Sequence, residues 1–379
     1  MKALHFGRFH DENFGGLERH VALLLKGLSR SIQVDNLVAN DRFASEVVFA
    51  EGYRVCKVPS LGVFAGMALC PTMPYRARKL HRREHYDIVH LHFPDPMSHL
   101  AAMALPKNVR LVISWHSDIV RQQKLLKLYR PFLDRIIARA DAIIAATPRH
   151  FSASTQLGCA DPARLHVVPY GIDFAPFEEP SAMAAGDKLR ARHPGRKIVF
   201  AVGRHVYYKG FEYLIHAMKA VRQDALLILG GTGPLSADLK ALAAAEGLEN
   251  RVVFAGRIPD EALPAYYHAA DVFCLPSVEP SEAFGLVQVE AMACMKPVVC
   301  CELGTGVSYV NQHEVTGLVV PPRDPAALAG AIDRLLGNDA LRTKMGVAGR
   351  SRAASEFSLQ QMWAGTLSVY RAILGRTCN

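Results

Sequence analysis

The sequence predicts an α/β protein made of two Rossmann-like, doubly wound domains that face a central cleft. With 379 residues, half of them hydrophobic, the chain is long enough for two cores of ordinary domain size. Two series of short apolar runs alternate with longer amphipathic stretches, which is typical of parallel sheets covered by helices. Between the series, from about residue 174 to 195, the pattern lapses, and we expect the interdomain connection there.

The first domain is predicted over residues 1–175. It opens with the apolar run KALHFG and continues with an amphipathic helix from Leu17 to Leu28. Further strands are expected in YDIVHLH (86–92), LVISWHS (111–117), ADAIIAAT (140–147) and RLHVVPYGID (164–173). Helical spacing separates these runs, so the sheet should be parallel.

The second domain is predicted over residues 196–355. Its strands are expected in KIVFAVG (197–203), ALLILGG (225–231), RVVFAG (251–256), DVFCLPS (271–277), KPVVCC (296–301) and TGLVVPP (316–322). Helical segments follow Asp324. No further strand is expected after the last of them, which lies within residues 356–379.

Cysteine usage and hydropathy limit the class of protein. The eight cysteines show no paired C-x-x-C spacing, so neither a disulfide framework nor a zinc site is expected. The N-terminus lacks the apolar core of a signal peptide, and no uncharged run approaches the ~20 residues that span a bilayer. We therefore expect a cytoplasmic protein.

The net positive charge of the protein comes entirely from the first half of the chain. Residues 1–172 hold 23 Lys and Arg against 14 Asp and Glu, a net charge of +9, whereas residues 173–379 hold 21 of each. Basic residues cluster at 76–83 and 121–139, the second with leucines at helical spacing. Such faces suit an anionic membrane surface or acceptor, and equally a solvated helix. Nucleic acid is not expected, because aromatic residues are not interleaved with the basic ones.

The strongest site motif follows the DVFCLPS run, where Glu282 and Glu290 are separated by seven residues. A helix starting near Gly285 would leave the backbone N–H groups from Phe284 to Leu286 free to bind an anion or a hydroxyl. Carboxylates bind vicinal diols, so the pair suits a nucleotide ribose and a hexose. The alternative is a helix N-terminal carboxylate and a solvated one, but Glu290 lies in an otherwise apolar stretch.

A second motif, GRHVYYKG, places Arg204 after a strand and Lys209 in the first turn of the helix that follows. Two cations at a helix N-terminus would bind a diphosphate and offset the charge that develops as it leaves. Alone, the motif also reads as a polar turn. No D-x-D carboxylate pair ends a strand, so these cations and no divalent metal are expected to neutralise the diphosphate.

Weaker signals come from glycines and one histidine at strand ends. Gly233, in GGTGP, would let backbone approach a nucleotide, and backbone near Ile258 would read its base. Gly15 and Gly16 fall where a phosphate-contacting loop is expected, but without the G-x-G-x-x-G fingerprint of a dehydrogenase. His116 could bind a sugar hydroxyl or assist proton movement, although a strand-end histidine is often structural.

Together these motifs resemble the retaining family 4 glycosyltransferases of the GT-B fold, over nearly the whole chain. The resemblance implies that Glu282 contacts the transferred sugar, that Glu290 contacts the ribose, and that Arg204 and Lys209 hold the diphosphate. It also implies N-terminal contacts to the donor from the Gly15-Gly16 loop and His116. The catalytic candidates are therefore His116, Arg204, Lys209 and Glu282, and the donor-binding candidates are Gly15, Gly16, Arg204, Lys209, Gly233, Ile258, Glu282, Phe284, Gly285, Leu286 and Glu290.

More narrowly, HLHFPDP, SWHSDIVRQQKLLKLYRP and SEAFGLVQVEAMA look like bacterial transferases that use GDP-mannose or a related GDP-sugar to build O-antigen or exopolysaccharide on lipid carriers. The resemblance implies a lipid-linked saccharide acceptor, no cofactor, and a last helix that packs back on the first domain. With such an acceptor, we expect the basic stretches 76–83 and 121–139 to bind the protein peripherally to the inner face of the plasma membrane. His205, Cys294 and Met295 depart from the family pattern. A UDP-sugar-dependent transferase, a nucleotide-sugar epimerase or hydrolase, and a non-catalytic nucleotide-sugar-binding partner remain open.

Overall fold

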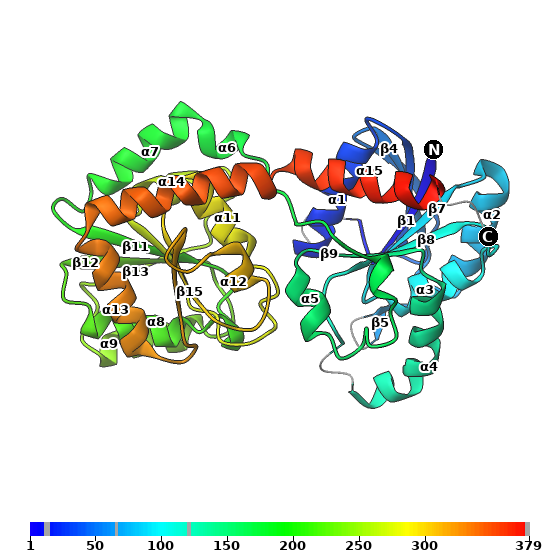
Figure 1. Cartoon of the computed structure of the whole chain (residues 1–379). Helices are drawn as coiled ribbons and strands as arrows, with labels where there is room; N and C mark the ends of the chain where they lie inside the picture. The colour runs from blue at the N-terminus through cyan, green and yellow to red at the C-terminus, as the bar shows by residue number, and fades with distance from the viewer. Residues whose placement is uncertain (11–15, 65–66, 120–122, 376–379) are drawn as a thin grey trace. The chain divides into compact units, whose positions relative to one another are not determined.

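The computed structural model describes residues 1–10, 16–64, 67–119 and 123–375 of the chain (Figure 1). It divides into two compact units. The first comprises Met1–Gly171 and Leu359–Asn379, and the second comprises Ile172–Ser358. Within the described residues, no helix is both long enough and apolar enough to cross a membrane.

The first unit is built on an eight-stranded sheet in the order β10-β9-β8-β7-β1-β2-β4-β3, in which only the β3–β4 pair is antiparallel. The strands of this sheet are β1 (Lys2–Gly7), β2 (Gln33–Ala39), β3 (Glu46–Ala50), β4 (Tyr53–Val58), β7 (Ile88–Phe93), β8 (Arg110–Trp115), β9 (Ala142–Ala145) and β10 (Leu165–Val167). A separate two-stranded pair joins β5 (Val63–Phe64) to β6 (Met67–Ala68). The five predicted strands are confirmed as a parallel set, whereas β2, β3 and β4 were not predicted.

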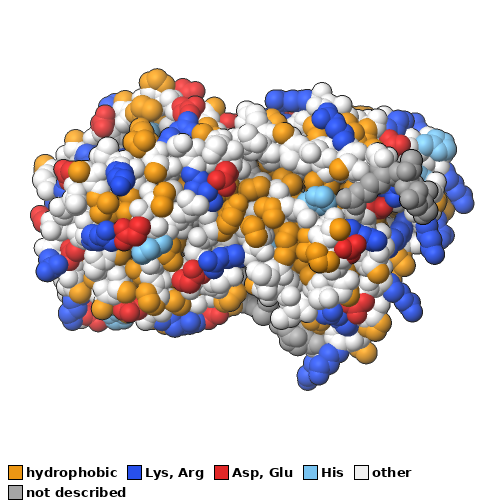
Figure 2. All heavy atoms as spheres, viewed as in Figure 1, with side chains coloured by type: hydrophobic (Ala, Val, Ile, Leu, Met, Phe, Trp, Pro, Cys, Tyr) orange, Lys and Arg blue, Asp and Glu red, His pale blue; other side chains and the backbone are white. Residues whose placement is uncertain are grey.

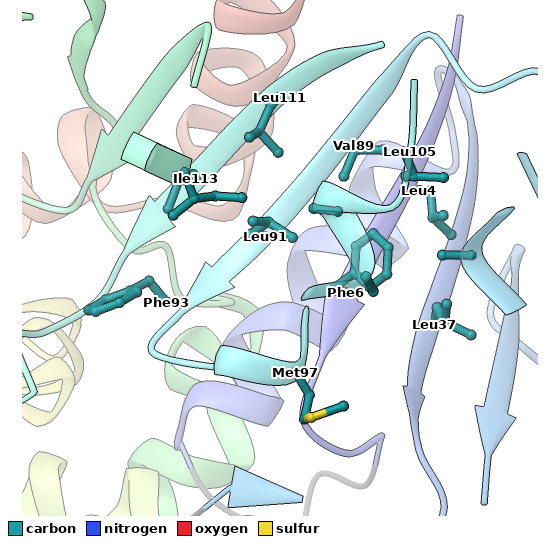
Figure 3. Close-up of a cluster of buried hydrophobic side chains, with 14 of the residues drawn as sticks. Leu4, Phe6, Leu37, Val89, Leu91, Phe93, Met97, Leu105, Leu111 and Ile113 are labelled. Carbon is teal, nitrogen blue, oxygen red and sulfur yellow. The ribbon is translucent and has the colours of Figure 1, made fainter. Parts of the chain in front are cut away.

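Helices cover both faces of this sheet. One face packs on α2 (Met73–Glu84), α3 (Pro96–Met103) and α4 (Gln123–Arg139) through one cluster of buried side chains, part of which Figure 3 shows. Leu4, Phe6 and Leu91 point into it from β1 and β7. Because side chains alternate along a strand, the neighbouring residues point to the opposite face.

The opposite face packs on α1 (Gly16–Leu28) and α15 (Leu359–Gly375). Gly27 of α1 makes their close approach possible, because a Cβ there would lie 1.9 Å from the Trp363 ring. The Trp363 indole also donates a hydrogen bond of 2.9 Å to the carbonyl of Leu23. The last helix of the chain therefore completes the first unit. Short α5 (Pro148–Ala153) lies after β9.

The second unit has a six-stranded, fully parallel sheet in the order β13-β12-β11-β14-β15-β16. Its strands are β11 (Lys197–Val202), β12 (Ala225–Gly230), β13 (Val252–Gly256), β14 (Val272–Leu275), β15 (Val298–Cys301) and β16 (Gly317–Val320). All six predicted strands are present. Numbered within the unit, the order is 3-2-1-4-5-6, the doubly wound Rossmann arrangement.

The helices of the second unit complete its layers. They are α6 (Ala175–Glu178), α7 (Pro180–Arg190), α8 (Phe211–Ala220), α9 (Ser236–Ala245), α10 (Leu263–Ala269), α11 (Leu286–Ala293), α12 (Val307–Val310), α13 (Pro325–Leu336) and α14 (Asp339–Glu356).

Residues 174–195, predicted as an interdomain connection, instead form α6 and α7 within the second unit. Helix α7 packs closely on α10, since a Cβ at Gly186 would lie 2.6 Å from the Cβ of His268. Its Arg190 pairs with Asp271 at 2.9 Å. Pro180 at a helix start and the alanines that follow favour this helix. The unit boundaries accordingly lie at Gly171 and Ser358, and not at the predicted positions 175, 196 and 355.

Candidate functional site

The candidate ligand site of the second unit lies at the point where the strand order reverses. Strands β11 and β14 are neighbours there, although β12 and β13 separate them in sequence. In open α/β sheets, ligands bind outside the carboxyl ends of the strands at such a switch point. The loops that follow β11 and β14 carry Lys209 and Glu282.

The sequence predicted Lys209 in the first turn of an α-helix. It lies instead in a short 3₁₀ turn formed by Tyr207–Lys209. Gly210 separates this turn from α8 because it adopts a left-handed conformation, with φ of +64°. A Cβ at Gly210 would lie 2.3 Å from the carbonyl oxygen of Pro276. The loops after β11 and β14 are also joined by a 2.8 Å hydrogen bond from the backbone N–H of Val278 to the carbonyl of Tyr208.

Lys209 and Glu282 meet directly across these two loops. The Lys209 Nζ donates to Glu282 Oε2 at 2.6 Å, and both side chains are 11% exposed. The Ser277 hydroxyl donates to the same carboxylate oxygen at 3.0 Å, and the Thr305 hydroxyl donates to the Glu282 carbonyl at 2.8 Å. The switch point therefore holds a nearly buried cation beside an anchored carboxylate. Arg204, which begins the same loop as Lys209, is exposed to solvent.

Helix α11 begins directly after Gly285, as the sequence predicts. Gly285 has φ of +74°, and a Cβ there would lie 2.7 Å from Leu275 Cδ2. The neighbouring Phe284 is buried edge-on against the ring of Phe357, with 5.7 Å between ring centroids. Leu286, the first residue of the helix, is half-buried. The backbone of residues 284–286 is thus fixed by packing on both sides.

Glu290 occupies the second turn of α11 and is half-buried. The hydroxyl of Tyr267, on α10, donates to Glu290 Oε2 at 2.7 Å. The pKa of Tyr267 is raised well above its ordinary value, mainly by burial and also by the nearby Glu290 carboxylate. The phenol therefore keeps its proton and remains a hydrogen-bond donor. The sequence gives no signal for Tyr267, because its stretch LPAYYHA reads as an ordinary buried helix.

The glycine-rich loop after β12 packs against the loop after β11. A Cβ at Gly233 would lie 2.4 Å from the carbonyl oxygen of His205. The backbone N–H of His205 donates to the Thr232 carbonyl at 3.1 Å, and its Nδ1 lies 2.9 Å from the Ser236 hydroxyl. His205, which departs from the family pattern, is thus a buried residue that joins the loops after β11 and β12 by hydrogen bonds. The close packing of these loops also requires a glycine at position 233.

Ile258 follows β13 and lies beside the end of β12. Its Cδ1 atom would be 2.5 Å from a Cβ at Gly230, so this glycine allows the two strand ends to approach. The Ile258 side chain is half-buried. The candidate residues of the second unit thus follow β11, β12, β13 and β14 at the carboxyl ends of neighbouring strands.

In the first unit, Gly16 is the exposed first residue of α1, and a Cβ there would meet no atom within 4 Å. Gly15 lies outside the described residues. His116 follows β8 and is 9% exposed. Its Nδ1 lies 2.6 Å from the Tyr170 hydroxyl, and its Nε2 lies 3.1 Å from Nδ1 of His92. Both ring nitrogens are therefore occupied, and burial lowers the pKa of His116 well below its ordinary value.

Three buried histidines near His116 are spaced closely enough to suggest a metal site. His5, His90 and His92 offer nitrogens within 4.8 Å of one another. However, these nitrogens already bond to one another or to nearby hydroxyls: His5 Nδ1 lies 3.2 Å from His92 Nε2, and His90 Nε2 lies 2.7 Å from the Ser114 hydroxyl. A metal ion would have to displace these bonds.

Comparison with known proteins agrees with this architecture. Residues 14–175 match the family described as Glycosyltransferase Family 4, and residues 187–352 match Glycosyl transferases group 1. The chain is 30% identical over 380 residues to the O-antigen chain mannosyltransferase C of Escherichia coli, covering 99% of both chains. It is 36% identical over 336 residues to the D-rhamnosyltransferase WbpZ of Pseudomonas aeruginosa, covering 88% of this chain and 86% of that protein.

Solved structures show the same fold over the whole chain. A sucrose-phosphate synthase from Thermosynechococcus elongatus superposes with a TM-score of 0.79 at 25% identity, covering 99% of this chain and all of that one. Together with the two parallel sheets and the full-length relatives, this shows the class of enzyme. The chain belongs to the GT-B glycosyltransferases that combine a family 4 domain with a group 1 domain.

Proposed function

We propose that this glycosyltransferase moves a mannosyl group from GDP-mannose to a lipid-linked saccharide in bacterial polysaccharide synthesis, with retention of the anomeric configuration. The observation that carries the proposal is the Lys209–Glu282 pair at the switch point of the second unit. The named activities of two relatives, an O-antigen mannosyltransferase and a D-rhamnosyltransferase, support a hexose donor and a polysaccharide product.

The donor is expected to bind across the loops that follow β11 and β14. Lys209 and the exposed Arg204 supply the positive charge for the diphosphate, and Glu290, held by Tyr267, supplies the carboxylate for the ribose diol. When the diphosphate engages Lys209, Glu282 is freed to accept hydrogen bonds from sugar hydroxyls. The ion pair thus holds both side chains in place before the donor binds.

The reaction then needs no protein nucleophile. The bond between the anomeric carbon and the phosphate oxygen breaks, and the acceptor oxygen bonds to that carbon on the same face. The proton of the acceptor hydroxyl passes to the departing phosphate oxygen. Lys209 and Arg204 stabilise the negative charge that develops on the diphosphate, without a metal ion or cofactor. The contact of His116 with the transferred sugar is proposed from the family resemblance alone.

The first test is calorimetric titration of the protein with GDP, UDP and ADP in EDTA, repeated with Glu290→Ala. Tight GDP binding that the substitution weakens is the expected result, and it supports a metal-free diphosphate site. Preference for UDP would replace the proposed donor with a UDP-sugar. Failure to bind any nucleotide would contradict the site.

The second test is transfer from the preferred nucleotide sugar to a lipid-linked saccharide, with product mass and anomeric configuration determined by mass spectrometry and NMR. A larger, α-configured glycan is expected from an α-linked donor. An isomerised nucleotide sugar, or free hexose without glycan, would favour an epimerase or hydrolase. Binding without any turnover would favour a non-catalytic nucleotide-sugar-binding partner.

We further propose that basic residues of the first unit dock the enzyme on the cytoplasmic face of the anionic inner membrane, where a lipid-linked acceptor resides. Lys and Arg side chains gather over the part of this unit where α2 lies (Figure 2). Lys79 and Arg82 are exposed there. Not every basic residue is available, because Arg78 and Arg139 donate to backbone carbonyls within the unit. Arg121 lies outside the described residues.

Charge reversal distinguishes membrane docking from a solvated helix face. Each Lys or Arg near an anionic leaflet contributes about 1 kcal/mol, so Lys79→Glu with Arg82→Glu should release the protein from phosphatidylserine vesicles in a sedimentation assay. The matched control is Lys188→Glu with Arg192→Glu, a pair of exposed residues in the second unit. Equal sedimentation of the two double variants would reject docking through α2.

A further inference from the structure

Six hydrogen bonds join seven side chains of the first unit into one unbranched chain, here called the histidine chain. In order, it runs through Tyr170, His116, His92, His5, Tyr370, His90 and Ser114. The distances between bonded atoms lie between 2.5 Å, for the Tyr370 hydroxyl and His90 Nδ1, and 3.2 Å, for His5 Nδ1 and His92 Nε2.

The sheet itself places these residues together. His5 is opposite His90 in the β1–β7 register, and His92 is opposite Ser114 in the β7–β8 register. All of them point to the face covered by α1 and α15, because they alternate with core residues of the other face. Tyr370 reaches the strands from α15. At most 9% of any of the four histidines of the chain is exposed.

The chemistry of a neutral imidazole makes this chain directional. One ring nitrogen carries a hydrogen and donates, while the other accepts. If Tyr170 donates to His116 Nδ1, then His116 must donate through Nε2, and the same holds in turn for His92 and His5. Tyr370 passes the direction on to His90. If the direction is reversed, all four histidines donate through Nδ1 instead.

Along His116, His92 and His5, every other combination places two N–H groups, or two lone pairs, face to face in a buried site, which is unfavourable. At Tyr370 the hydroxyl could instead accept from both His5 and His90, but its own buried hydrogen would then lose its acceptor in the chain, which is also unfavourable. The two ends do not choose the direction, because the hydroxyls of Tyr170 and Ser114 can each donate or accept. The four histidines therefore share one tautomer. A group that contacts any member of the chain biases all of them.

We propose that the histidine chain sets the tautomer of His116, and so decides whether its Nδ1 offers a donor or an acceptor to a ligand hydroxyl that takes the place of Tyr170. His92 and Tyr370 are then positioning residues for His116. The identity of that hydroxyl, on the transferred sugar or the acceptor, rests on the proposed function. The shared tautomer does not.

The test is ¹⁵N NMR of the full-length protein with labelled histidine, since the Nδ1 and Nε2 shifts report the tautomer of each ring. His5, His90, His92 and His116 should show the same tautomer. Any two of them in opposite tautomers would overturn the proposal. So would the loss of their hydrogen-bonded shifts on addition of one equivalent of Zn²⁺, because the cluster would then be a metal site.

Two hydroxyl deletions test the coupling. Tyr370→Phe removes one link at the far side of His5, and Tyr170→Phe removes the link at His116 itself. Each should change the tautomer populations of both His5 and His116. His99, a buried histidine of the same unit that bonds to Tyr129 outside the chain, should not respond. Independent behaviour of His5 and His116 in both variants would contradict a common direction.

Enzyme kinetics with two substitutions of His92 then test the role in transfer. His92→Leu interrupts the chain, whereas His92→Gln retains one donor and one acceptor and should restore the wild-type tautomer of His116. If interruption leaves both tautomers equally populated, half of the enzyme is competent, and kcat should fall at least about twofold with an unchanged donor KM. An unaltered His116 tautomer in His92→Leu would reject the proposal. Absence of transfer by the wild-type enzyme would reject the proposed function, but not the shared tautomer seen by NMR.

Discussion

Lys209 Nζ and Glu282 Oε2 lie 2.6 Å apart, although the two residues belong to loops that follow different strands of the second unit. This ion pair bridges the switch point between β11 and β14. It keeps the cation expected at the diphosphate and the carboxylate expected at the sugar within one hydrogen bond of each other. Substitution of either residue should therefore affect the other.

Lys209→Ala and Glu282→Ala should each reduce the rate of transfer by about a hundredfold or more, because each removes a preorganised electrostatic contact.

Each single variant should also lose about 3 kcal/mol of unfolding free energy, because it leaves a nearly buried charge unpaired. The double variant Lys209→Met with Glu282→Gln should lose less. Activity assays and urea unfolding measure both. The control is Lys219→Ala, which breaks a more exposed pair with Glu246 and should cost less than about 1 kcal/mol. A near-normal rate in either alanine variant would remove that residue from the site.

Tyr267→Phe should weaken GDP binding about fivefold, because the Glu290 carboxylate, which we propose binds the ribose, loses the hydroxyl that orients it. Calorimetry measures the change in Kd. Tyr266→Phe is the matched control, since Tyr266 is the preceding residue of α10 and stacks on Phe200. If the two variants bind GDP equally well, Tyr267 does not support the nucleotide site.

Gly210→Ala should lower both Tm and activity, because a Cβ at this left-handed residue would collide with the Pro276 carbonyl and displace Lys209. Gly247→Ala separates the effect of the collision from that of backbone conformation. Gly247 has a similar φ of +68°, but a Cβ there meets no atom within 4 Å. That control should lose about 1–2 kcal/mol of stability and keep its activity. Equal activity losses would point to backbone strain in general.

The first unit should lose stability in mild acid. Burial lowers the pKa of His5 to about 3, of His20 to about 4 and of His99 to about 3. The unfolded chain binds protons on these residues near pH 6.5, while the folded chain excludes them. The free energy of unfolding is therefore fully retained above about pH 7, and falls as the pH drops from about 6.5 towards 4 by up to about 1.4 kcal/mol per pH unit for each histidine.

Urea unfolding across this pH range measures the slope. His20→Gln removes one of these groups and should reduce the slope by about one proton. An unchanged slope in that variant, or a stability that does not vary between about pH 5 and pH 7, would contradict the neutral buried state of these rings.

The alternation of apolar runs and amphipathic stretches predicted all six strands of the second unit and the start of α11, because hydrophobic periodicity reports which residues are buried. In the first unit it predicted five of the eight strands of the large sheet and missed β2, β3 and β4. It did not predict α7, whose alanines and charges resemble a linker until its packing on α10 is seen. It placed Lys209 in a helix because it cannot show that Gly210 must turn left-handed against Pro276. Such long-range contacts are absent from local sequence.

His5, His90 and His92 of the first unit were not predicted as site residues, although the sequence pattern places them. Like the predicted His116, which follows β8, each takes an alternate position in or just after a strand, in KALHFG, IVHLHF and ISWHS. This spacing places them on one face of a sheet, but the order of neighbouring strands is needed to see that they meet. Tyr370 lies in the last helix, and nothing in the sequence pairs it with His5.

The packing of Trp363 against Gly27 also determines the order in which the protein can be completed during synthesis. The second unit is one continuous segment, whereas the first unit begins at Met1 and requires α15, which follows the entire second unit. On the ribosome, the second unit can fold as soon as it emerges. The first must wait with one face of its sheet partly uncovered, and the histidine chain cannot form until Tyr370 has left the exit tunnel.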